Sequence, residues 1–531
     1  MVAFRTHLTV LAESAARYPL SPVFRTPLFD QKTTKVLEWR IITFSQFQSD
    51  VEHFARYWGR TLKGVPQRSV VGLWLGGLSY VDALHIYGMA RAGYVPQLFS
   101  LRLPNPDVIY DLMRKSNAKS LVYDPTYAVD LTSSPFPVHP AVDVSSIDLR
   151  SAPLPRMIEA IKGTDTIMIF HTSGSTSGCP KLVPCSYFWL NAIIHKAGQV
   201  SKPISPKQDV TVWMGSMCHI GQTFMFLGSL QHGACTIQPT EIGFSSDELV
   251  DMISRCELNR LNQFPAFLGI HIRNSRQNPK LLARLCGLDE ILYSGQPMPR
   301  EDEEWAYKNN MRITDVFGST ECGAMLVSVC GGGRPNPPVR PLQGTKYGFF
   351  PCSMTSEPGY SNANGNLVEL VILAESGDCP DPSLRSADGH YHTGDLFLEV
   401  SPGAYVSRGR NDDWIKSANA LRCDTKAIED NVRATCGDLV ADCIVVGNGR
   451  PSPALFVEPL INMDVEKIRK EIIRKTRHFH SRRYLHERIT SPNMVIIVPA
   501  GTLPRTATKA NIRRRAVEDM FKVELDRIFN A

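Results

Sequence analysis

The chain has 531 residues, of which 43% are apolar and 21% charged, and its formal net charge is +6. This composition is typical of a globular protein, and the length suggests two to four domains. The apolar runs fall far short of the roughly 18 residues that a membrane span requires, and the N-terminus lacks a secretory pattern. We therefore expect a cytoplasmic protein without a membrane span, and the modest charge gives no indication of nucleic-acid binding.

The thirteen cysteines are all found from Cys179 onward, and none has CxxC spacing. They stand in apolar or mixed sequence. We expect buried reduced thiols rather than a disulfide framework or a zinc site.

The first 330 residues alternate between strand and helix patterns. Apolar residues at helical spacing over 41–58, with Thr43 and Gln46 as a capping box, predict an amphipathic helix. A strand over 70–75, a helix over 79–92 and a further strand from 94 predict a parallel βαβ unit. Further strands are expected at 120–123, 166–170, 211–214 and 290–293. The predicted fold class is therefore α/β, with a large body of layered α/β subdomains.

The pattern changes after about residue 330. A loop rich in Gly and Pro precedes strands and turns without long helices, which predicts a β-rich part over about 331–408 of an N-terminal core over 1–408. A junction at 409–411 leads into a small α+β domain over 412–531. Its helices are expected at 425–435, 463–475 and 513–528, and its strands at 441–446, 454–457 and 494–498.

A phosphate-binding composition follows the apolar strand that ends near Phe170. Residues 172–181 contain two glycines, several hydroxyl side chains and a lysine, which together suit an anion. A plain Gly/Ser turn is the alternative from this segment alone. Because Cys179 and Pro180 separate Gly178 from Lys181, the spacing disfavours a Walker-type ATPase or kinase.

The segment 467–488 is strongly basic, with nine Lys or Arg residues against two Glu. A solvated helix face is one interpretation. A patch for an anionic partner, such as a phosphorylated cofactor or an acidic carrier protein, is the other.

Four further motifs join the phosphate loop in a fixed order: Asp315 to Glu321, Tyr391 to Asp395, Ser407 to Lys416, and Leu503 to Lys509. Together they resemble the adenylate-forming, or AMP-binding, superfamily of acyl- and aryl-CoA synthetases and peptide synthetase adenylation domains. The sequence around Asp412 to Asp430 is similar, more narrowly, to fungal synthetase-like adenylation domains of adenylate-forming reductases.

The resemblance implies ATP and Mg²⁺ as cofactors. It assigns the β and γ phosphates to a loop made of Thr172, Ser173, Gly174, Ser175, Thr176, Gly178 and Lys181. It assigns adenine to Asp315, which would bond the amino group, and to Phe317, which would stack on the ring. Other expected nucleotide contacts are Gly295, Gln296, Pro297 and Gly318.

The remaining implied roles concern ribose, metal and catalysis. Asp395 would accept from two ribose hydroxyls, and Arg410 would bond ribose or phosphate. Glu321 would ligate Mg²⁺, a hard cation that prefers oxygen ligands. The catalytic set that the resemblance implies is Lys509, His219, Thr320 and Glu321.

Two of these expectations concern the small domain. Asp412 is expected to be the hinge about which the domain swings, bringing Lys509 to the site for adenylation and removing it for thioester formation. In the family a Gly precedes this lysine, whereas Thr508 precedes Lys509 here. A solvated helix-capping lysine is the alternative.

The acid substrate is expected to lie near His219. Amino-acid-activating relatives carry an Asp after the aromatic residue of this segment, and here Ile220 follows His219. An ammonium group in an apolar pocket without a carboxylate would cost several kcal/mol. An aryl or acyl acid is therefore favoured over an α-amino acid, in a pocket formed by His219, Ile220, Phe264, Gly295 and Thr320.

The expected enzyme is an AMP-forming acid–thiol ligase. Only 22 residues follow Lys509, too few for a carrier domain of at least ~50 residues, which favours coenzyme A as the acceptor. The narrower resemblance favours loading of a phosphopantetheine carrier protein. A catalytically inactive nucleotide-binding protein is a third alternative, supported only by the altered sequence around Lys509.

Overall fold

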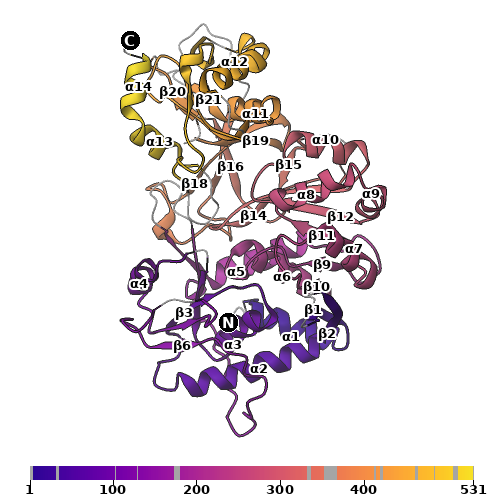
Figure 1. The fold of residues 1–531 in the computed structure, drawn as a ribbon. Coiled ribbons are helices and arrows are strands. Elements are labelled where there is room, and N and C mark those ends of the chain that lie inside the picture. Colours follow the sequence, from indigo (N-terminus) through magenta and orange to yellow (C-terminus); the bar gives the residue numbers. More distant parts are fainter. Residues whose placement is uncertain are drawn as a thin grey trace.

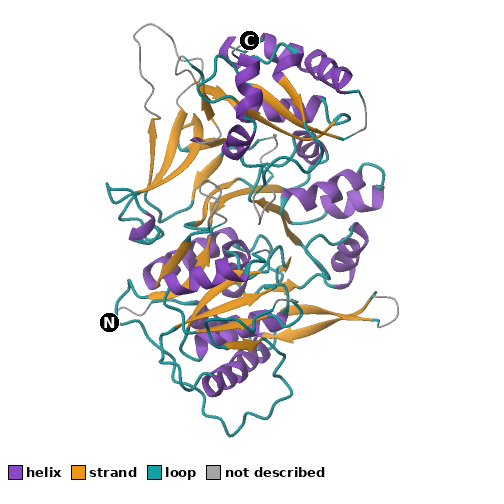
Figure 2. Ribbon diagram, turned by 60° about the vertical axis from the view of Figure 1, so that its left-hand side comes forward, coloured by secondary structure: helices purple, strands orange, loops and turns teal. Residues whose placement is uncertain are grey.

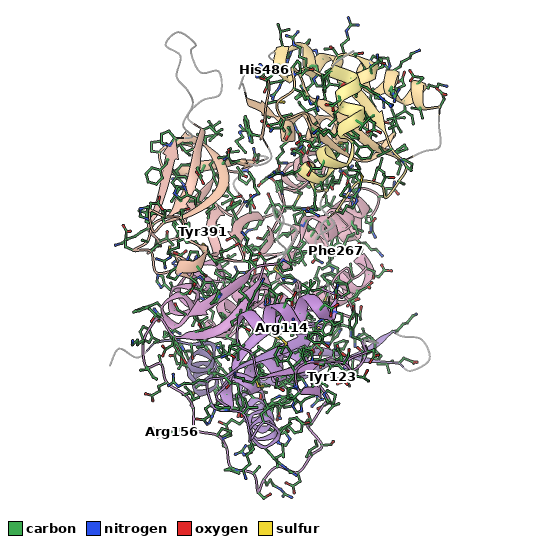
Figure 3. All side chains as sticks on the ribbon, turned by 90° about the vertical axis from the view of Figure 1, so that its left-hand side faces the viewer. Arg114, Tyr123, Arg156, Phe267, Tyr391 and His486 are labelled. Carbon is green, nitrogen blue, oxygen red and sulfur yellow. The ribbon has the colours of Figure 1, made fainter. Side chains whose placement is uncertain are left out.

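The structure, a computed structural model, describes residues 4–529 apart from 31–34, 102, 128–129, 173–179, 332–335, 352–366, 412–413, 419–421, 461–463, 484 and 506–511. Figure 1 shows the N-terminal body at one end, the small C-terminal domain at the other and the strands β14 to β19 between them. In Figure 3, His486 lies in the small domain, Arg156 at the opposite end and Tyr391 between them. No helix among the described residues is both long and apolar enough to cross a membrane.

The first sheet is predominantly parallel and covered by helices. In order across the sheet, its strands are β6 (Val138–Pro140), β5 (Ser120–Tyr123), β3 (Val70–Leu75), β4 (Val95–Ser100), β7 (Thr166–His171) and the antiparallel β8 (Leu182–Ser186). The helices of this region are α1 (His7–Arg17), α2 (Phe44–Thr61), α3 (Tyr80–Arg91) and α4 (Pro106–Lys115). Strand β3 is apolar and almost wholly buried, as expected where both faces of a parallel sheet are covered. Figure 2 shows helices on both sides of the strands of the body.

The second sheet has more strands than the first, and its strand pairing changes from parallel to antiparallel across its width. Its parallel part contains β10 (Cys235–Ile237), β9 (Val210–Val212), β11 (Arg260–Gln263), β12 (Glu290–Ser294) and β13 (Ile313–Ser319). The hairpin of β1 (Pro22–Phe29) and β2 (Val36–Thr43) ends one side. The other side continues as β14 (Gly323–Ser328), β15 (Val339–Pro341), β19 (Ala404–Arg410), β18 (Tyr391–Ser401), β17 (Leu367–Ile372) and β16 (Tyr347–Pro351). The predicted β-rich part therefore extends the parallel sheet by hydrogen bonding.

Helices α5 (Tyr187–Val200) and α6 (Ile220–Gln231) pack on each other, and α5 contacts β7 and β8 of the first sheet and β14 of the second. The remaining helices of the body are α7 (Ser246–Arg255), α8 (Pro265–Ser275), α9 (Pro279–Cys286) and α10 (Arg300–Lys308).

The small domain has its own apolar core. Its described elements are the hairpin β20 (Trp414–Lys416) and β21 (Arg422–Asp424), the sheet of β22 (Val440–Val446), β23 (Ala454–Pro459) and β24 (Val495–Ile497), and helices α11 (Thr425–Thr435), α12 (Val465–Ser481), α13 (Arg514–Met520) and α14 (Lys522–Phe529). The apolar faces of α11 and α12 meet on this sheet through Ile428, Val432, Ile468 and Ile472. The α+β fold of this region and the layered α/β body agree with the sequence analysis.

Two local predictions need correction. Thr43 does cap α2 by accepting from the Gln46 amide nitrogen (3.2 Å), but the Gln46 side chain donates to Asp50 (2.7 Å) and does not complete the capping box. The helix expected over 513–528 is two helices that break at Phe521, whose ring packs on Phe456 with centroids 4.8 Å apart.

The described cysteines are free thiols, and most of them are buried. Burial raises the pKa of several, for example that of Cys235 to about 12, so these thiols stay protonated at neutral pH. The described cysteines are thus mostly buried, as expected, and their reduced state stays a prediction.

Burial lowers the pKa of five described histidines from 6.5 to about 4: His7, His85, His171, His271 and His480. Between these values the unfolded chain binds more protons than the folded chain. The free energy of unfolding is therefore highest above pH 6.5 and falls as the pH falls toward 4, by up to about 3 kcal/mol per histidine.

We predict that His7→Phe weakens this pH dependence. Neither ring nitrogen of His7 has a hydrogen-bond partner among the described residues, and the ring packs against the edge of Tyr87 at 5.0 Å, so phenylalanine should fit there. Thermal denaturation from pH 8 to 5 should show a falling Tm for the wild type and a smaller fall for the variant. Equal slopes for the two proteins would contradict the assignment.

Candidate functional site

The ends of the predicted phosphate loop lie at the tip of the β7–β8 hairpin. The Thr172 backbone N–H donates to the Lys181 carbonyl (3.1 Å), and the Lys181 N–H approaches the Thr172 hydroxyl at 3.4 Å. The loop therefore leaves and re-enters the sheet at one point. Its other predicted members, Ser173, Gly174, Ser175, Thr176 and Gly178, lie outside the described residues.

His171 fixes the base of this loop, a role that the sequence did not reveal. Its ring stacks on Phe99 with centroids 4.4 Å apart, and Nδ1 lies 2.9 Å from the Leu98 carbonyl oxygen. Because a carbonyl only accepts, Nδ1 carries the proton and Nε2 accepts from Gln97 at 3.1 Å. Burial lowers the pKa of His171 to about 4, with a further contribution from His219. The His171 ring is therefore neutral and lies close to His219.

His219 and Ile220 stand at the start of helix α6. His219 is the N-cap residue and is half-buried, and Ile220 is buried. The segment before them rests on the β3–α3 connection, where the Ser216 hydroxyl donates to the Gly76 carbonyl (2.7 Å). A Cβ added at the exposed Gly221 would meet no described atom within 4 Å. Open space therefore adjoins the first turn of α6.

The predicted pocket residues Phe264 and Gly295 are in contact. Gly295 has a φ of +96°, and a Cβ placed on it would lie 3.5 Å from the Phe264 ring. On another side, a Cβ on Gly215 would lie 3.1 Å from the same ring. The ring is thus packed against two glycine backbones, and Gly215 is a wall residue that the sequence analysis did not identify.

A cleft of about 2220 Å³ lies between the body and the small domain. Five of the predicted nucleotide contacts line it: Gln296, Pro297, Asp315, Phe317 and Arg410. Gln296, Pro297, Asp315 and Phe317 come together because β12 and β13 pair in parallel, with Tyr293 opposite Asp315. Arg410 stands at the end of β19. The carboxyl ends of parallel strands are where open α/β sheets bind ligands.

Asp315 lies in an acidic, largely buried part of this cleft. Burial, followed by the charge of Glu303, raises the pKa of Asp315 to about 7. Glu303 approaches the Tyr293 hydroxyl at 3.5 Å, and burial also raises its pKa. In the free protein Asp315 is therefore partly protonated near neutral pH.

Phe317 and Gly318 lie farther along β13. The edge of the Phe317 ring meets Phe397 at 5.0 Å and 82°, while part of Phe317 remains exposed to the cleft. Gly318 has no room for a side chain, since a Cβ would lie 2.6 Å from the Gly323 carbonyl oxygen.

Asp395 and Arg410 are cross-strand partners on β18 and β19. Their side chains form an ion pair of 3.4 Å. Asp395 is largely buried, whereas the Arg410 side chain is 43% exposed and lines the cleft. A guanidinium held in this way presents its remaining N–H groups to a ribose or phosphate oxygen.

Thr320 and Glu321 form the turn between β13 and β14, and both are half-buried. The Glu321 carbonyl accepts from the Trp189 indole (2.8 Å). Its carboxylate has no hydrogen bond or ion pair with another described residue. Burial, followed by the charge of Glu321, raises the pKa of Tyr391, so the two side chains lie close together. The described residues contain no cluster of three or more His, Cys, Asp or Glu suited to a metal. A cation at Glu321 would therefore need oxygen ligands from a phosphate or water, which is how Mg²⁺ binds in nucleotide sites.

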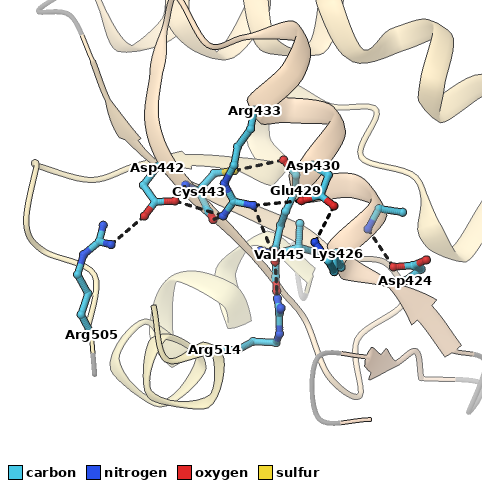
Figure 4. A network of polar contacts seen from close by, with 11 residues as sticks. Asp424, Lys426, Glu429, Asp430, Arg433, Asp442, Cys443, Val445, Arg505 and Arg514 are labelled. Carbon is cyan, nitrogen blue, oxygen red and sulfur yellow. Dashed lines mark hydrogen bonds and ion pairs between the residues drawn. The ribbon is translucent and has the colours of Figure 1, made fainter. Parts of the chain in front are cut away.

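The small domain contributes a charged network to the opposite wall of the cleft (Figure 4). Arg433 lies between Glu429 and Asp442, at 3.9 and 3.2 Å. Arg505 donates to Asp442 (2.8 Å), and Arg514 donates to Glu429 (2.6 Å). Along the chain, Arg505 precedes and Arg514 follows the segment 506–511, which contains Lys509. Lys509 and the expected hinge residue Asp412 lie outside the described residues.

The basic segment 467–488 is mostly helix α12. Several of its cations have local acidic partners, including Arg474 with Glu471 (2.8 Å) and Lys475 with Asp438 (2.6 Å). Lys467, Lys470 and Arg477 are exposed along its outer face. This arrangement fits a solvated helix face and leaves the proposal of an anionic partner untested.

Comparisons with known proteins show the family of the chain. Residues 11–350 match the family model described as AMP-binding enzyme, and residues 412–531 match the AMP-binding enzyme C-terminal domain. The chain is 34% identical to the AMP-binding domain-containing enzyme iboA of Amanita muscaria, over 94% of this chain and 98% of that protein. It is 22% identical to adenylate-forming reductase Nps11 of Serpula lacrymans, over 74% of this chain but only 36% of the reductase.

The fold is also that of solved synthetases. The chain superimposes on O-succinylbenzoate coenzyme A synthetase of Bacillus subtilis in complex with AMP with a TM-score of 0.76 at 14% identity, covering 97% of this chain and 98% of that one. For the same enzyme with ATP and a magnesium ion, the TM-score is 0.74 at 14% identity, with 96% and 99% covered. The chain therefore belongs to the adenylate-forming family of AMP-binding enzymes.

Proposed function

We propose that this protein uses ATP to activate a small aryl or acyl carboxylic acid and then transfers the acyl group to coenzyme A. In the first step a carboxylate oxygen attacks the α-phosphorus, the bond to the β-phosphate oxygen breaks, and pyrophosphate leaves. In the second step a thiolate attacks the acyl carbonyl and AMP leaves. The observation that carries the proposal is the convergence of Asp315, Phe317 and Arg410 on one cleft.

The nucleotide would bind along the carboxyl ends of β12 and β13. Phe317 would stack on adenine, and the ionised Asp315 would accept from the adenine amino group, beside Gln296 and Pro297. Asp395 and Arg410, already paired at 3.4 Å, would bond the ribose. Gly318 lets β13 approach β14 closely beside Phe317, because a side chain there would clash with the Gly323 carbonyl.

The phosphates would lie between the β7–β8 loop, closed by Thr172 and Lys181, and the turn bearing Thr320 and Glu321. A Mg²⁺ ion held there by Glu321 would neutralise charge as pyrophosphate departs. Lys509 would supply a second positive charge near the α-phosphate. These positive charges, held in fixed positions, would stabilise the negative charge of the transition state. The first step needs no general base because the acid is already ionised.

The acid would enter beside His219, with Ile220, Phe264 and Gly295 as walls. No carboxylate occupies the position of Ile220, which is 7% exposed and packs in the main apolar core. An α-ammonium group would therefore be left without a charge partner at this position, which costs several kcal/mol. An aromatic or medium-length acyl group fits these walls better.

We predict that pyrophosphate is released in the presence of ATP, Mg²⁺ and an aryl or acyl acid, and that Lys509→Ala lowers its rate by about two orders of magnitude or more, as expected for loss of a charge that acts in the transition state. A pyrophosphate assay over a panel of carboxylic acids, including α-amino acids, measures both. Lys467→Ala, an exposed change in the same domain, should keep the wild-type rate.

Near-normal release from Lys509→Ala would remove this lysine from the mechanism. ATP binding without pyrophosphate release across the whole panel would favour an inactive nucleotide-binding protein over the enzyme.

The thiol acceptor requires its own experiment. We expect mass spectrometry to detect the acyl-CoA thioester after incubation with ATP, coenzyme A and a benzoate-like acid. Acyl-AMP without acyl-CoA would contradict the proposed acceptor and favour a phosphopantetheine carrier protein, the alternative suggested by the similarity to a fungal adenylate-forming reductase.

We predict that the affinity for ATP falls as the pH falls below 7. Asp315 has a pKa of about 7 in the free protein, and only its ionised form accepts from the adenine amino group. If binding requires that form, the dissociation constant rises by about tenfold per pH unit below the pKa. Calorimetric titrations between pH 6 and 8.5 measure the dissociation constant for ATP.

Asp315→Asn is the matched control for this titration. The ratio of wild-type to variant affinities removes the titration of the ATP phosphates themselves. A ratio that stays constant across the range would contradict the adenine role of Asp315.

A further inference from the structure

Helix α5 holds the turn that carries Glu321 through two buried side chains. The Trp189 indole N–H donates to the Glu321 carbonyl at 2.8 Å, and the Lys196 ammonium donates to the Cys322 carbonyl at 2.6 Å. Trp189 is 2% exposed and Lys196 is 1% exposed. Two consecutive carbonyl groups are therefore fixed from one helix.

The peptide unit between Glu321 and Cys322 is held at both ends. Its carbonyl oxygen accepts a hydrogen bond from Trp189. Its N–H donates to the Ser319 hydroxyl, with 3.3 Å between the nitrogen and the oxygen. A planar peptide that is bonded on both sides cannot rotate without losing a hydrogen bond. The direction in which the Glu321 side chain leaves the backbone is thereby restricted.

The Lys196 ammonium has three acceptors for its three protons. Besides the Cys322 carbonyl, these are Asp378 at 2.5 Å and the Tyr347 hydroxyl oxygen at 3.4 Å. Asp378 is buried and also accepts from Ser376 at 2.6 Å. Burial, together with Asp378, raises the pKa of Tyr347 well above its usual value, so the phenol remains neutral.

Such a buried ion pair adds little net stability, because desolvation of both ions offsets their attraction. A geometric role accounts for it better. Lys196 joins α5, the β13–β14 turn and the Ser376–Asp378 turn of the β-rich part at one point. The side chain that immediately precedes this junction on the turn is Glu321.

We propose that Trp189 and Lys196 are positioning residues that orient the Glu321 carboxylate toward the metal–nucleotide complex. This inference rests on the proposed function, which assigns Glu321 to the metal. Neither side chain touches nucleotide in this account, since each acts through a backbone carbonyl of the turn.

Trp189→Phe tests the proposal most cleanly, because it removes the indole donor and keeps an aromatic ring in the core. Binding of Mn²⁺ to the protein with α,β-methylene-ATP is measured from the free Mn²⁺ signal in electron paramagnetic resonance. We expect a three- to tenfold weaker Mn²⁺ affinity than in the wild type, with the melting temperature close to wild type. Trp305→Phe is the matched control, since that indole donates to Ser275 at 3.1 Å, away from the turn. It should leave the Mn²⁺ affinity unchanged.

A double-mutant cycle separates positioning from general packing. If Trp189 acts through Glu321, Trp189→Phe should have no further effect on Mn²⁺ affinity in a Glu321→Gln background. Lys196→Met should behave in the same way if it folds, and Tyr347→Phe, which keeps the ion pair, should have the smaller effect.

The results separate a failure of the positioning role from a failure of the metal assignment. Wild-type Mn²⁺ affinity for Trp189→Phe, or an equal loss in both backgrounds, overturns the positioning role while the function of Glu321 stands. An unchanged affinity in Glu321→Gln itself contradicts the metal assignment of the proposed function, and the positioning role fails with it.

Discussion

The parallel pairing of β12 with β13 is the constraint on which the candidate site depends. It sets Tyr293 opposite Asp315 and Ser294 opposite Val316, so the segments that follow both strands leave the sheet at the same edge. Gly295 to Pro297 therefore lie beside Asp315 and Phe317. Antiparallel pairing of β18 with β19 brings Asp395 and Arg410 together in the same sheet. Residues spread over more than one hundred positions of the chain meet because one continuous sheet carries them.

The charges of the site are organised before any ligand binds. Burial raises the pKa of Asp315, and Asp395 is paired with Arg410. The Glu321 carboxylate has no hydrogen-bond or ion-pair partner among the described residues, while α5 holds the backbone of its turn. These three carboxyl groups have different surroundings and suit different partners: an amino group, hydroxyl groups and a cation. In the small domain, Arg505 and Arg514, which precede and follow the segment that contains Lys509, are fixed to acidic residues, and Arg514 lines the cleft. Because these side chains are already held in place, they lose little conformational freedom when a highly charged nucleotide binds.

Much of this was accessible from the sequence, and the exceptions have physical causes. Short motifs predicted Asp315, Phe317, Asp395 and Arg410, because their roles depend on local strand and turn geometry. The contacts of Trp189 with Glu321 and of Lys196 with Asp378 join residues 132 and 182 positions apart, and no local pattern predicts them. The break at Phe521 was missed because apolar spacing continues through it and only packing on Phe456 reveals it. Gly215 could not be predicted as a wall residue from the sequence, because its role depends on the Phe264 ring that packs beside it in the structure. The domain boundary at 409–411 and the roles of Lys509 and Asp412 stay predictions.

In the proposed reaction, a carboxylate attacks the α-phosphate of ATP. Incubation of the protein with ATP, Mg²⁺, coenzyme A and a carboxylic acid labelled with ¹⁸O in both oxygens tests it directly, with mass spectrometry of the nucleotide products. We expect AMP that carries one ¹⁸O, because the bridging oxygen of the acyl-adenylate stays with phosphorus when the acyl group is transferred. Unlabelled AMP, or ADP in place of AMP, would contradict it.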